Sequence, residues 1–81
     1  MFVKVKEVAP MTDYRLHAVF EGGAVRQYDV KPLFDKWAVF NDLKHDGLFE
    51  RVRVDDGGYG VVWNDEIDLS CDELYWNGVP V

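Results

Sequence analysis

The fold is decided by residues 13–30, which read DYRLHAVFEGGAVRQYDV. Apolar side chains occupy every second position from Tyr14 to Phe20, and this period of two is typical of a strand with one buried face. The paired glycines at positions 22 and 23 supply the positive φ angles that tight hairpin turns require. Residues 24–30 continue as a second extended segment. We therefore predict an antiparallel hairpin that turns at Glu21-Gly22-Gly23.

Further strands are predicted on both sides of this hairpin. Alternation of valine with charged residues indicates a first strand that begins near Val3 and ends at Pro10. A second hairpin is expected downstream, with one strand over 49–54, a turn at Asp55-Asp56-Gly57-Gly58 and a return over 59–63. A polar loop over 64–68 leads out of it.

Two helical stretches complete the pattern. The first starts at Lys31-Pro32, and its apolar positions Leu33, Trp37, Phe40 and Leu43 share one helical face. One helix, or a short turn followed by a separate helix over 38–45, both fit this spacing. The second helix is expected over 71–76, because Ser70 and Glu73 have the spacing of a capping box. The order β-β-β-α-β-β-α predicts a single α+β domain over 1–81, built of antiparallel hairpins and two short helices.

The charge of the chain is uneven. Residues 1–40 hold six Lys or Arg and five Asp or Glu, whereas residues 41–81 hold three and ten, and the net charge is −6. An acidic half repels nucleic-acid phosphates, so direct binding of DNA or RNA is not expected. A solvated acidic surface that aids solubility is the simpler interpretation. The alternative is a surface that meets a basic protein partner.

The termini and the cysteine content indicate a cytoplasmic protein. The N-terminus alternates apolar and cationic residues, unlike a signal peptide, and no apolar run approaches the ~20 residues of a membrane span. The single cysteine, Cys71, cannot form an intrachain disulfide. At the start of a helix flanked by acids, it is expected to be a packed, inert thiol.

No group of residues has the spacing of a nucleophile–base pair, a metal site or a phosphate-binding loop, so we predict no cofactor and no catalytic centre. The carboxylates between Asp55 and Asp68 lack the loop that calcium requires, and Gly57-Gly58-Tyr59-Gly60 lacks the lysine that follows a phosphate loop. An alternative is a small-molecule pocket assembled from distant residues such as His17, Tyr28 and Asp68.

Large side chains are expected mainly in the core, because a domain of this size needs them there. Tyr75 and Trp76 are adjacent on a helix and point about 100° apart, so one of them is expected to remain exposed. We place a candidate interaction surface at six positions: Trp63, Asp65, Glu66, Asp68, Tyr75 and Trp76.

The sequence also resembles a known bacterial family. The resemblance rests on Tyr14-Arg15-Leu16-x-Ala18-x-Phe20-x-Gly22-Gly23, on Tyr28-Asp29-Val30, on Phe40-x-x-Leu43, on Phe49-x-x-Val52-x-Val54 and on Trp63-x-x-x-x-Asp68-Leu69-x-x-Asp72-x-Leu74-Tyr75. This pattern is similar to DUF2442, whose representative fold is named for the NE0471 N-terminal domain.

The resemblance implies a small α+β domain, followed in some longer relatives by a helix-turn-helix segment that this sequence lacks. Occurrence of family members near small toxin-like genes suggests a regulatory or antitoxin-like role. Together with the residues above, this leads us to expect a non-enzymatic module that binds another protein or a second copy of itself.

Overall fold

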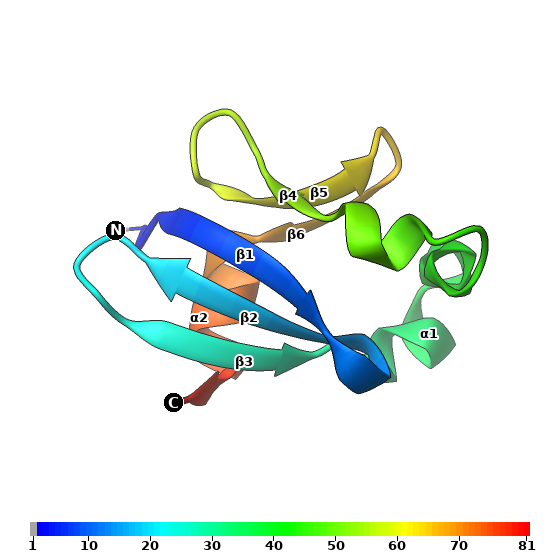
Figure 1. The fold of residues 1–81 in the computed structure, drawn as a ribbon, viewed down its shortest axis with the longest axis horizontal. Coiled ribbons are helices and arrows are strands. Elements are labelled where there is room, and N and C mark those ends of the chain that lie inside the picture. Colours follow the sequence, from blue (N-terminus) through cyan, green and yellow to red (C-terminus); the bar gives the residue numbers. More distant parts are fainter. Residues whose placement is uncertain (1) are drawn as a thin grey trace.

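The computed structural model describes residues 2–81 as two antiparallel sheets joined by short helices (Figure 1). The strands are β1 (Val5–Met11), β2 (Arg15–Phe20), β3 (Val25–Asp29), β4 (Arg53–Val54), β5 (Gly60–Asn64), β6 (Ile67–Ser70) and β7 (Val79–Pro80). The α-helices are α1 (Pro32–Lys36) and α2 (Cys71–Asn77), and the 3-10 helices are η1 (Thr12–Tyr14), η2 (Ala38–Lys44) and η3 (Leu48–Arg51). The strand orders are β1-β2-β3-β7 and β4-β5-β6. The predicted α+β class with antiparallel hairpins is confirmed.

The β2–β3 hairpin forms as predicted. Gly22 and Gly23 have φ angles of 94° and 100°, and the Phe20 N–H donates to the Ala24 carbonyl oxygen at 2.8 Å. The alternation along β2 buries Leu16 and Phe20 completely, whereas His17 between them lies on the opposite face. This hairpin supplies one wall of the core.

The ends of the first strands differ from the prediction. Pro10 lies inside β1, opposite Leu16, and is tolerated because β1 is an edge strand. Asp13 and Tyr14 do not start β2, because both have positive φ angles in η1. Lys31 holds this turn: its Nζ donates to the Asp13 carbonyl oxygen at 2.6 Å and pairs with the Asp13 carboxylate at 3.0 Å.

The first helical stretch is broken at Trp37, which resolves the alternative left open by the sequence. Trp37 has extended backbone angles (φ −131°, ψ 111°), so α1 ends there and η2 starts in a new direction. Leu33 and Phe40 are buried as predicted, but Trp37 is 53% exposed. The prediction that Trp37 shares their buried face is wrong, because that prediction required an uninterrupted helix.

Two segments of the second half also adopt other structures than expected. Phe49 to Arg51 form η3 and only Arg53 and Val54 form a strand, so the predicted strand over 49–54 is shorter. Ile67 and Asp68, predicted as loop, begin β6. Ile67 is buried and Asp68 is exposed, the alternation of a strand with one solvated face.

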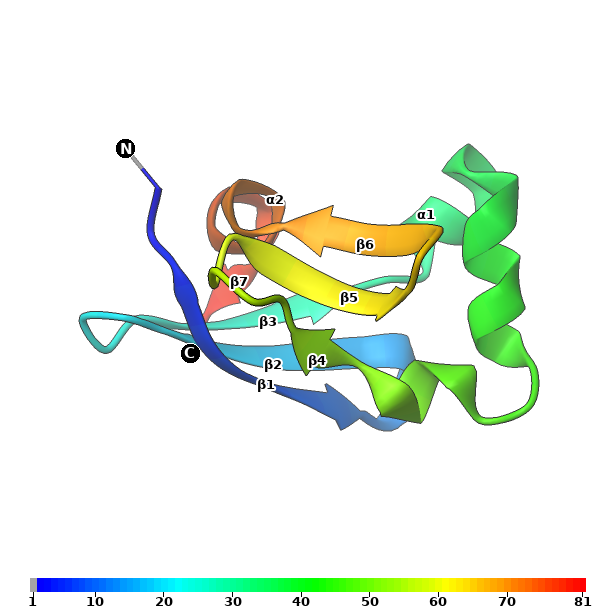
Figure 2. The same cartoon turned by 90° about the horizontal axis from the view of Figure 1, so that it is seen from above.

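The core lies between the two sheets, with α2 packed beside them (Figures 1 and 2). Trp63 on β5 occupies its centre: the indole is 5% exposed, stacks on Phe49 and donates from Nε1 to the Phe49 carbonyl oxygen at 3.1 Å. Leu74 and Cys71 bring α2 onto the same core.

Among residues 2–81, no helix has the length and apolar character needed to span a bilayer.

Candidate interaction surface

The side chains with the greatest chemical reactivity are not brought together. His17 lies on the outer face of the first sheet, between Ala9 and Gln27 on the neighbouring strands. Cys71 points into the core from the first turn of α2 and is 1% exposed. His45 lies beyond the end of η2. Over the described range 2–81, no three His, Cys, Asp or Glu side chains are grouped as metal ligands would be.

Cys71 has the environment of an inert thiol. Burial, followed by the negative charge of neighbouring Asp72, raises the pKa of the Cys71 thiol. The reactive thiolate is therefore disfavoured at neutral pH. The backbone N–H of Cys71 donates to the Tyr59 carbonyl oxygen at 2.7 Å, which ties the start of α2 to the residue that precedes β5.

The capping box predicted for α2 forms only in part. The Ser70 hydroxyl oxygen accepts from the Glu73 N–H at 3.1 Å, as expected. The Glu73 carboxylate accepts instead from the Tyr28 hydroxyl at 2.7 Å, which links α2 to β3. Burial and then the hydrogen bond to Glu73 raise the pKa of Tyr28 well above its usual range. Tyr28 is therefore a neutral hydrogen-bond donor at physiological pH.

A cavity of about 330 Å³ adjoins this hydrogen bond, between β3, α1 and α2. Tyr28 and Glu73 line it together with Lys36 and Asn77. Of the three residues predicted for a dispersed pocket, only Tyr28 is found there. His17 projects from the outer sheet face, and Asp68 projects from β6 into solvent, so neither contributes.

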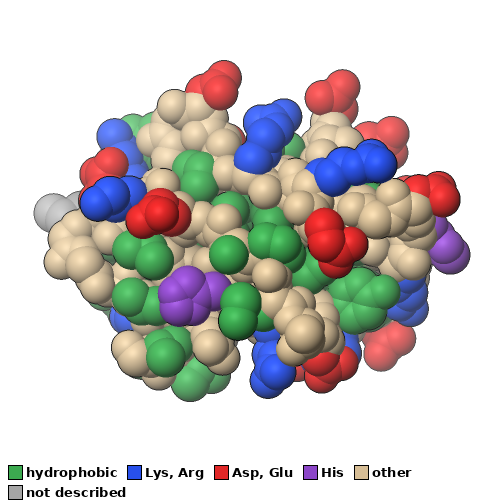
Figure 3. Space-filling model, viewed as in Figure 1, with side chains coloured by type: hydrophobic (Ala, Val, Ile, Leu, Met, Phe, Trp, Pro, Cys, Tyr) green, Lys and Arg blue, Asp and Glu red, His purple; other side chains and the backbone are tan. Residues whose placement is uncertain are grey.

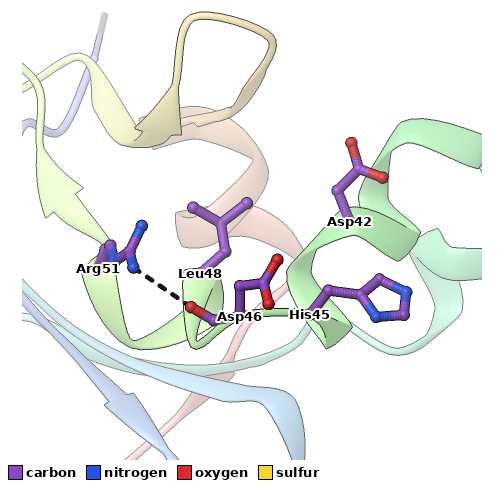
Figure 4. A pocket seen from close by; sticks show the side chains of 5 residues that line it. All are labelled: Asp42, His45, Asp46, Leu48 and Arg51. Carbon is purple, nitrogen blue, oxygen red and sulfur yellow. Dashed lines mark hydrogen bonds between the residues drawn. The ribbon is translucent and has the colours of Figure 1, made fainter.

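A second hollow, of about 430 Å³, lies between η2 and η3. Figure 4 shows that Asp42 and His45 point in different directions around it and converge on no common point. Arg51 is engaged by the backbone, donating from Nη2 to the Asp46 carbonyl oxygen at 3.3 Å. The hollow is open to solvent and lacks the convergent polar groups of a ligand site.

The six residues predicted for an interaction surface separate into three places. Trp63 is buried and is therefore a core residue. Asp65 and Glu66 are exposed in the turn between β5 and β6, and Asp68 is exposed on β6. Tyr75 is half-buried on α2, and neighbouring Trp76 is 72% exposed. Since β6 runs from the turn to α2, the acids of the turn and the start of α2 lie at opposite ends of one strand (Figure 2).

The surface of β6 and α2 is predominantly acidic, with Arg26 of β3 as the basic side chain packed on α2. Residues 54–81 contain seven Asp or Glu and no Lys or Arg. The seven side chains are all at least partly exposed: Asp55, Asp56, Asp65, Glu66, Asp68, Asp72 and Glu73. Arg53 on β4 faces outward in the same cross-strand row as Val62 and Asp68 and marks the edge of this region. We name Asp65, Glu66, Asp68, Asp72 and Trp76 the acidic surface.

The outer face of the first sheet has a different character. By strand register, Val19, Val25 and the 43% exposed Met11 lie on the same face as His17. Figure 3 shows hydrophobic side chains around a histidine on this face. In the part of the chain that the structure describes, no helix crosses this face (Figure 1). The period of two along residues 14–20 places His17 opposite the buried face, but it does not by itself predict that this outer face is partly apolar. The signal that indicates it is valine at positions 19 and 25.

Comparison with protein families agrees with this fold. The model of a family described as "Protein of unknown function (DUF2442)" matches residues 5–79. The chain belongs to the DUF2442 family. The resemblance inferred from the sequence is thereby confirmed. None of the curated protein sequences compared with this DUF2442 chain is similar to it.

The DUF2442 chain is also similar to a solved structure, that of NE0471 from Nitrosomonas europaea ATCC 19718, called a "Putative DNA Binding Protein". The two share 26% sequence identity with a TM-score of 0.80, over 95% of this chain. The match covers 49% of NE0471, so this chain spans about half the length of that protein.

Proposed function

We propose that this DUF2442 domain is a non-enzymatic, cytoplasmic interaction module that binds a basic protein through the acidic surface. The observation that carries the proposal combines two features. Trp76 is 72% exposed, and it lies in a segment, residues 54–81, that contains seven carboxylates and no Lys or Arg. Exposed aromatic residues are enriched at protein interfaces. The electrostatic field of a surface with one sign of charge speeds its encounter with a partner of opposite charge.

Residues 54–81 contribute seven carboxylates and no Lys or Arg, and the basic side chains beside them come from other segments: Arg26, Lys36 and Arg53. Negative charge therefore predominates on this surface. An excess of carboxylates repels the backbone of nucleic acids, whereas a Lys- or Arg-rich protein gains charge complementarity. Asp65, Glu66 and Asp68 form no hydrogen bonds through their carboxylates within the described chain, so these groups are available to a partner.

The experiment compares two variants that remove equal charge. The first combines Asp65→Asn, Glu66→Gln and Asp68→Asn; the matched control combines Asp35→Asn, Asp42→Asn and Glu50→Gln, which are exposed carboxylates on the helical segments. A partner co-purified from native cells is identified, and its affinity for each variant is measured. We expect the acidic-surface variant to bind about tenfold more weakly, mainly through slower association, and the control to bind nearly unchanged.

Equal loss of affinity in both variants would show that only net charge matters and would contradict the proposal. A strictly monomeric protein that retrieves no partner would contradict it as well, and size-exclusion light scattering measures this directly. Within the proposed function, the antitoxin-like role that the family resemblance suggests predicts that the partner is the product of a neighbouring gene.

Self-association is the related alternative, and the outer face of the first sheet favours it. A second copy that covers Val19, Val25 and Met11 would bury the exposed apolar area around His17. Light scattering would then give twice the monomer mass. Met11→Lys would restore the monomer without affecting the acidic surface.

Small-molecule binding is a separate candidate, supported by the cavity beside Tyr28 and Glu73. Its volume of about 330 Å³ is within the range of ligand pockets. A thermal-shift screen of metabolites tests it, since a ligand at 100 times its dissociation constant stabilises the folded domain by about 2.7 kcal/mol.

DNA binding, the role that the name of NE0471 gives, predicts that the domain is retained on duplex DNA and that this retention weakens steeply with salt.

A further inference from the structure

The exposed aromatic side chains differ in whether a cation of the same chain already covers them. Lys36 Nζ lies 5.7 Å from the ring centroid of Trp37, and Lys4 Nζ lies 4.9 Å from that of Tyr59. Half-buried Tyr75 is covered by the guanidinium of Arg26 at 4.3 Å. Trp76, the most exposed aromatic residue, has no such cation among residues 2–81.

Trp76 is held on a fixed support. Its ring packs edge-on against Tyr75, with centroids 5.0 Å apart, and Tyr75 packs in the same way against buried Phe20 at 5.2 Å. Arg26 also holds Tyr75, since its guanidinium covers the ring at 4.3 Å and its Nε donates to the Tyr75 carbonyl oxygen at 3.0 Å. A rigid aromatic support reduces the entropy that a partner must overcome on binding.

Carboxylates occupy the preceding turn of the same helix. Asp72 lies four residues and Glu73 three residues before Trp76, spacings that place side chains side by side on a helix. Helical side chains lean toward the N-terminus, and this tendency directs a side chain at position 76 toward the turn that carries Asp72. Glu73 is engaged by Tyr28, whereas the half-exposed Asp72 carboxylate forms no hydrogen bond or ion pair within residues 2–81.

We propose that Trp76 and Asp72 together receive a Lys or Arg side chain of the partner protein. This inference rests on the proposed function and names the contact at one end of the acidic surface. Tryptophan is the best aromatic partner for a cation, and a nearby carboxylate adds a charge-assisted hydrogen bond. Arginine fits best, because its planar guanidinium stacks on the ring while its edge faces the carboxylate.

The test uses acetylated octa-arginine amide as the probe, with octa-glutamate as the negative control. Nuclear magnetic resonance follows the indole N–H signals of Trp37, Trp63 and Trp76 in the full chain. We expect a saturable shift of the Trp76 signal, while the signals of Trp37 and buried Trp63 stay nearly constant. Trp76→Ala should weaken octa-arginine binding roughly 2- to 5-fold, with Trp76→Phe intermediate.

Trp37→Ala is the matched control, since Trp37 is also exposed but already carries Lys36 over its ring. Equal affinity of Trp76→Ala and the unmodified protein would overturn this inference. If affinity nevertheless falls in the Asp65/Glu66/Asp68 variant, the proposed function stands without it. If octa-arginine does not bind the unmodified protein at all, the Trp76 contact is overturned. That result would also count against the acidic surface as a binding site for basic proteins.

Discussion

Tyr28 shows how a single side chain joins distant parts of the chain. Its ring is buried and its hydroxyl donates to the Glu73 carboxylate at 2.7 Å, so β3 is connected to α2 across 45 positions of sequence. The sequence placed Tyr28 in a possible pocket and Glu73 in a helix cap. The link between them could not be predicted, because it depends on how α2 packs against the sheet.

Tyr28→Phe should destabilise the domain by about 1 kcal/mol, because it leaves the Glu73 carboxylate without this donor in a half-buried position. Urea denaturation measures the change. Tyr59→Phe is the control: Tyr59 is 50% exposed, and its substitution should change the free energy of unfolding by less than about 0.5 kcal/mol. Equal effects at both positions would exclude a special role for the Tyr28 hydroxyl.

The same hydrogen bond predicts an alkaline effect. Burial and Glu73 raise the pKa of folded Tyr28 above the unfolded value of 10.0. Below that pH both states are protonated and the stabilisation is complete; above it the unfolded state loses its proton first, so stability falls as the pH rises. The stability difference between the unmodified protein and Tyr28→Phe should therefore shrink above pH 10. A difference that stays constant through this range would contradict the raised pKa.

The three tryptophans illustrate the limit of residue-scale prediction. Trp63 is buried as expected for a small domain, but Trp37 and Trp76 are 53% and 72% exposed. Helical position alone correctly indicated that Tyr75 and Trp76 cannot both be fully buried. It could not indicate that a break at Trp37 turns that side chain out of the core.

At the scale of elements, local signals were sufficient where a turn or a cap fixes the backbone. The hairpin at Gly22 and Gly23 and the N-cap at Ser70 were both predicted from neighbouring residues. The strand β6 was missed, because the polar residues before it suggested a loop. The alternation of buried Ile67 and Leu69 with exposed Asp68 was the available signal.

Ser70→Ala should destabilise the domain by about 1 kcal/mol, because the N–H of Glu73 loses its acceptor at the start of α2. Ser70→Asp should restore most of this stability, since aspartate is an equally good N-cap. Thermal unfolding followed by circular dichroism compares the three proteins. No difference between Ser70→Ala and the unmodified protein would show that α2 is stabilised by packing alone.

Gly60 is required where β5 approaches β6. A Cβ at this position would collide with the backbone carbonyl of Leu69, which no side-chain rotation can relieve. Gly60→Ala should therefore destabilise the domain by roughly 2 kcal/mol or more, a large effect for one methyl group. Denaturant midpoints provide the measurement. If Gly60→Ala is as stable as the unmodified protein, the backbones of β5 and β6 can move apart at this position at little cost in free energy.

At the scale of the molecule, the fold class and the acidic half were both evident from the sequence. The position of that charge was not: only the structure shows that Asp68 projects outward on β6 while Ile67 and Leu69 fill the core. The candidate surface predicted from the sequence includes Trp63, although a domain of this size is expected to bury its large side chains. The burial of Trp63 against Phe40 and Phe49 depends on segments far apart in the chain, so no local signal separates it from the surface residues.

The most direct test of the acidic surface is site-specific photo-crosslinking in native cells. A benzophenone side chain replaces Val62, which faces outward beside Asp68, so that no carboxylate is removed; the control replaces Ala38, an exposed residue of η2. We expect crosslinks from position 62 to a Lys- or Arg-rich segment of one partner protein, and few from position 38. Equal capture at both positions, or capture at position 38 alone, would contradict it.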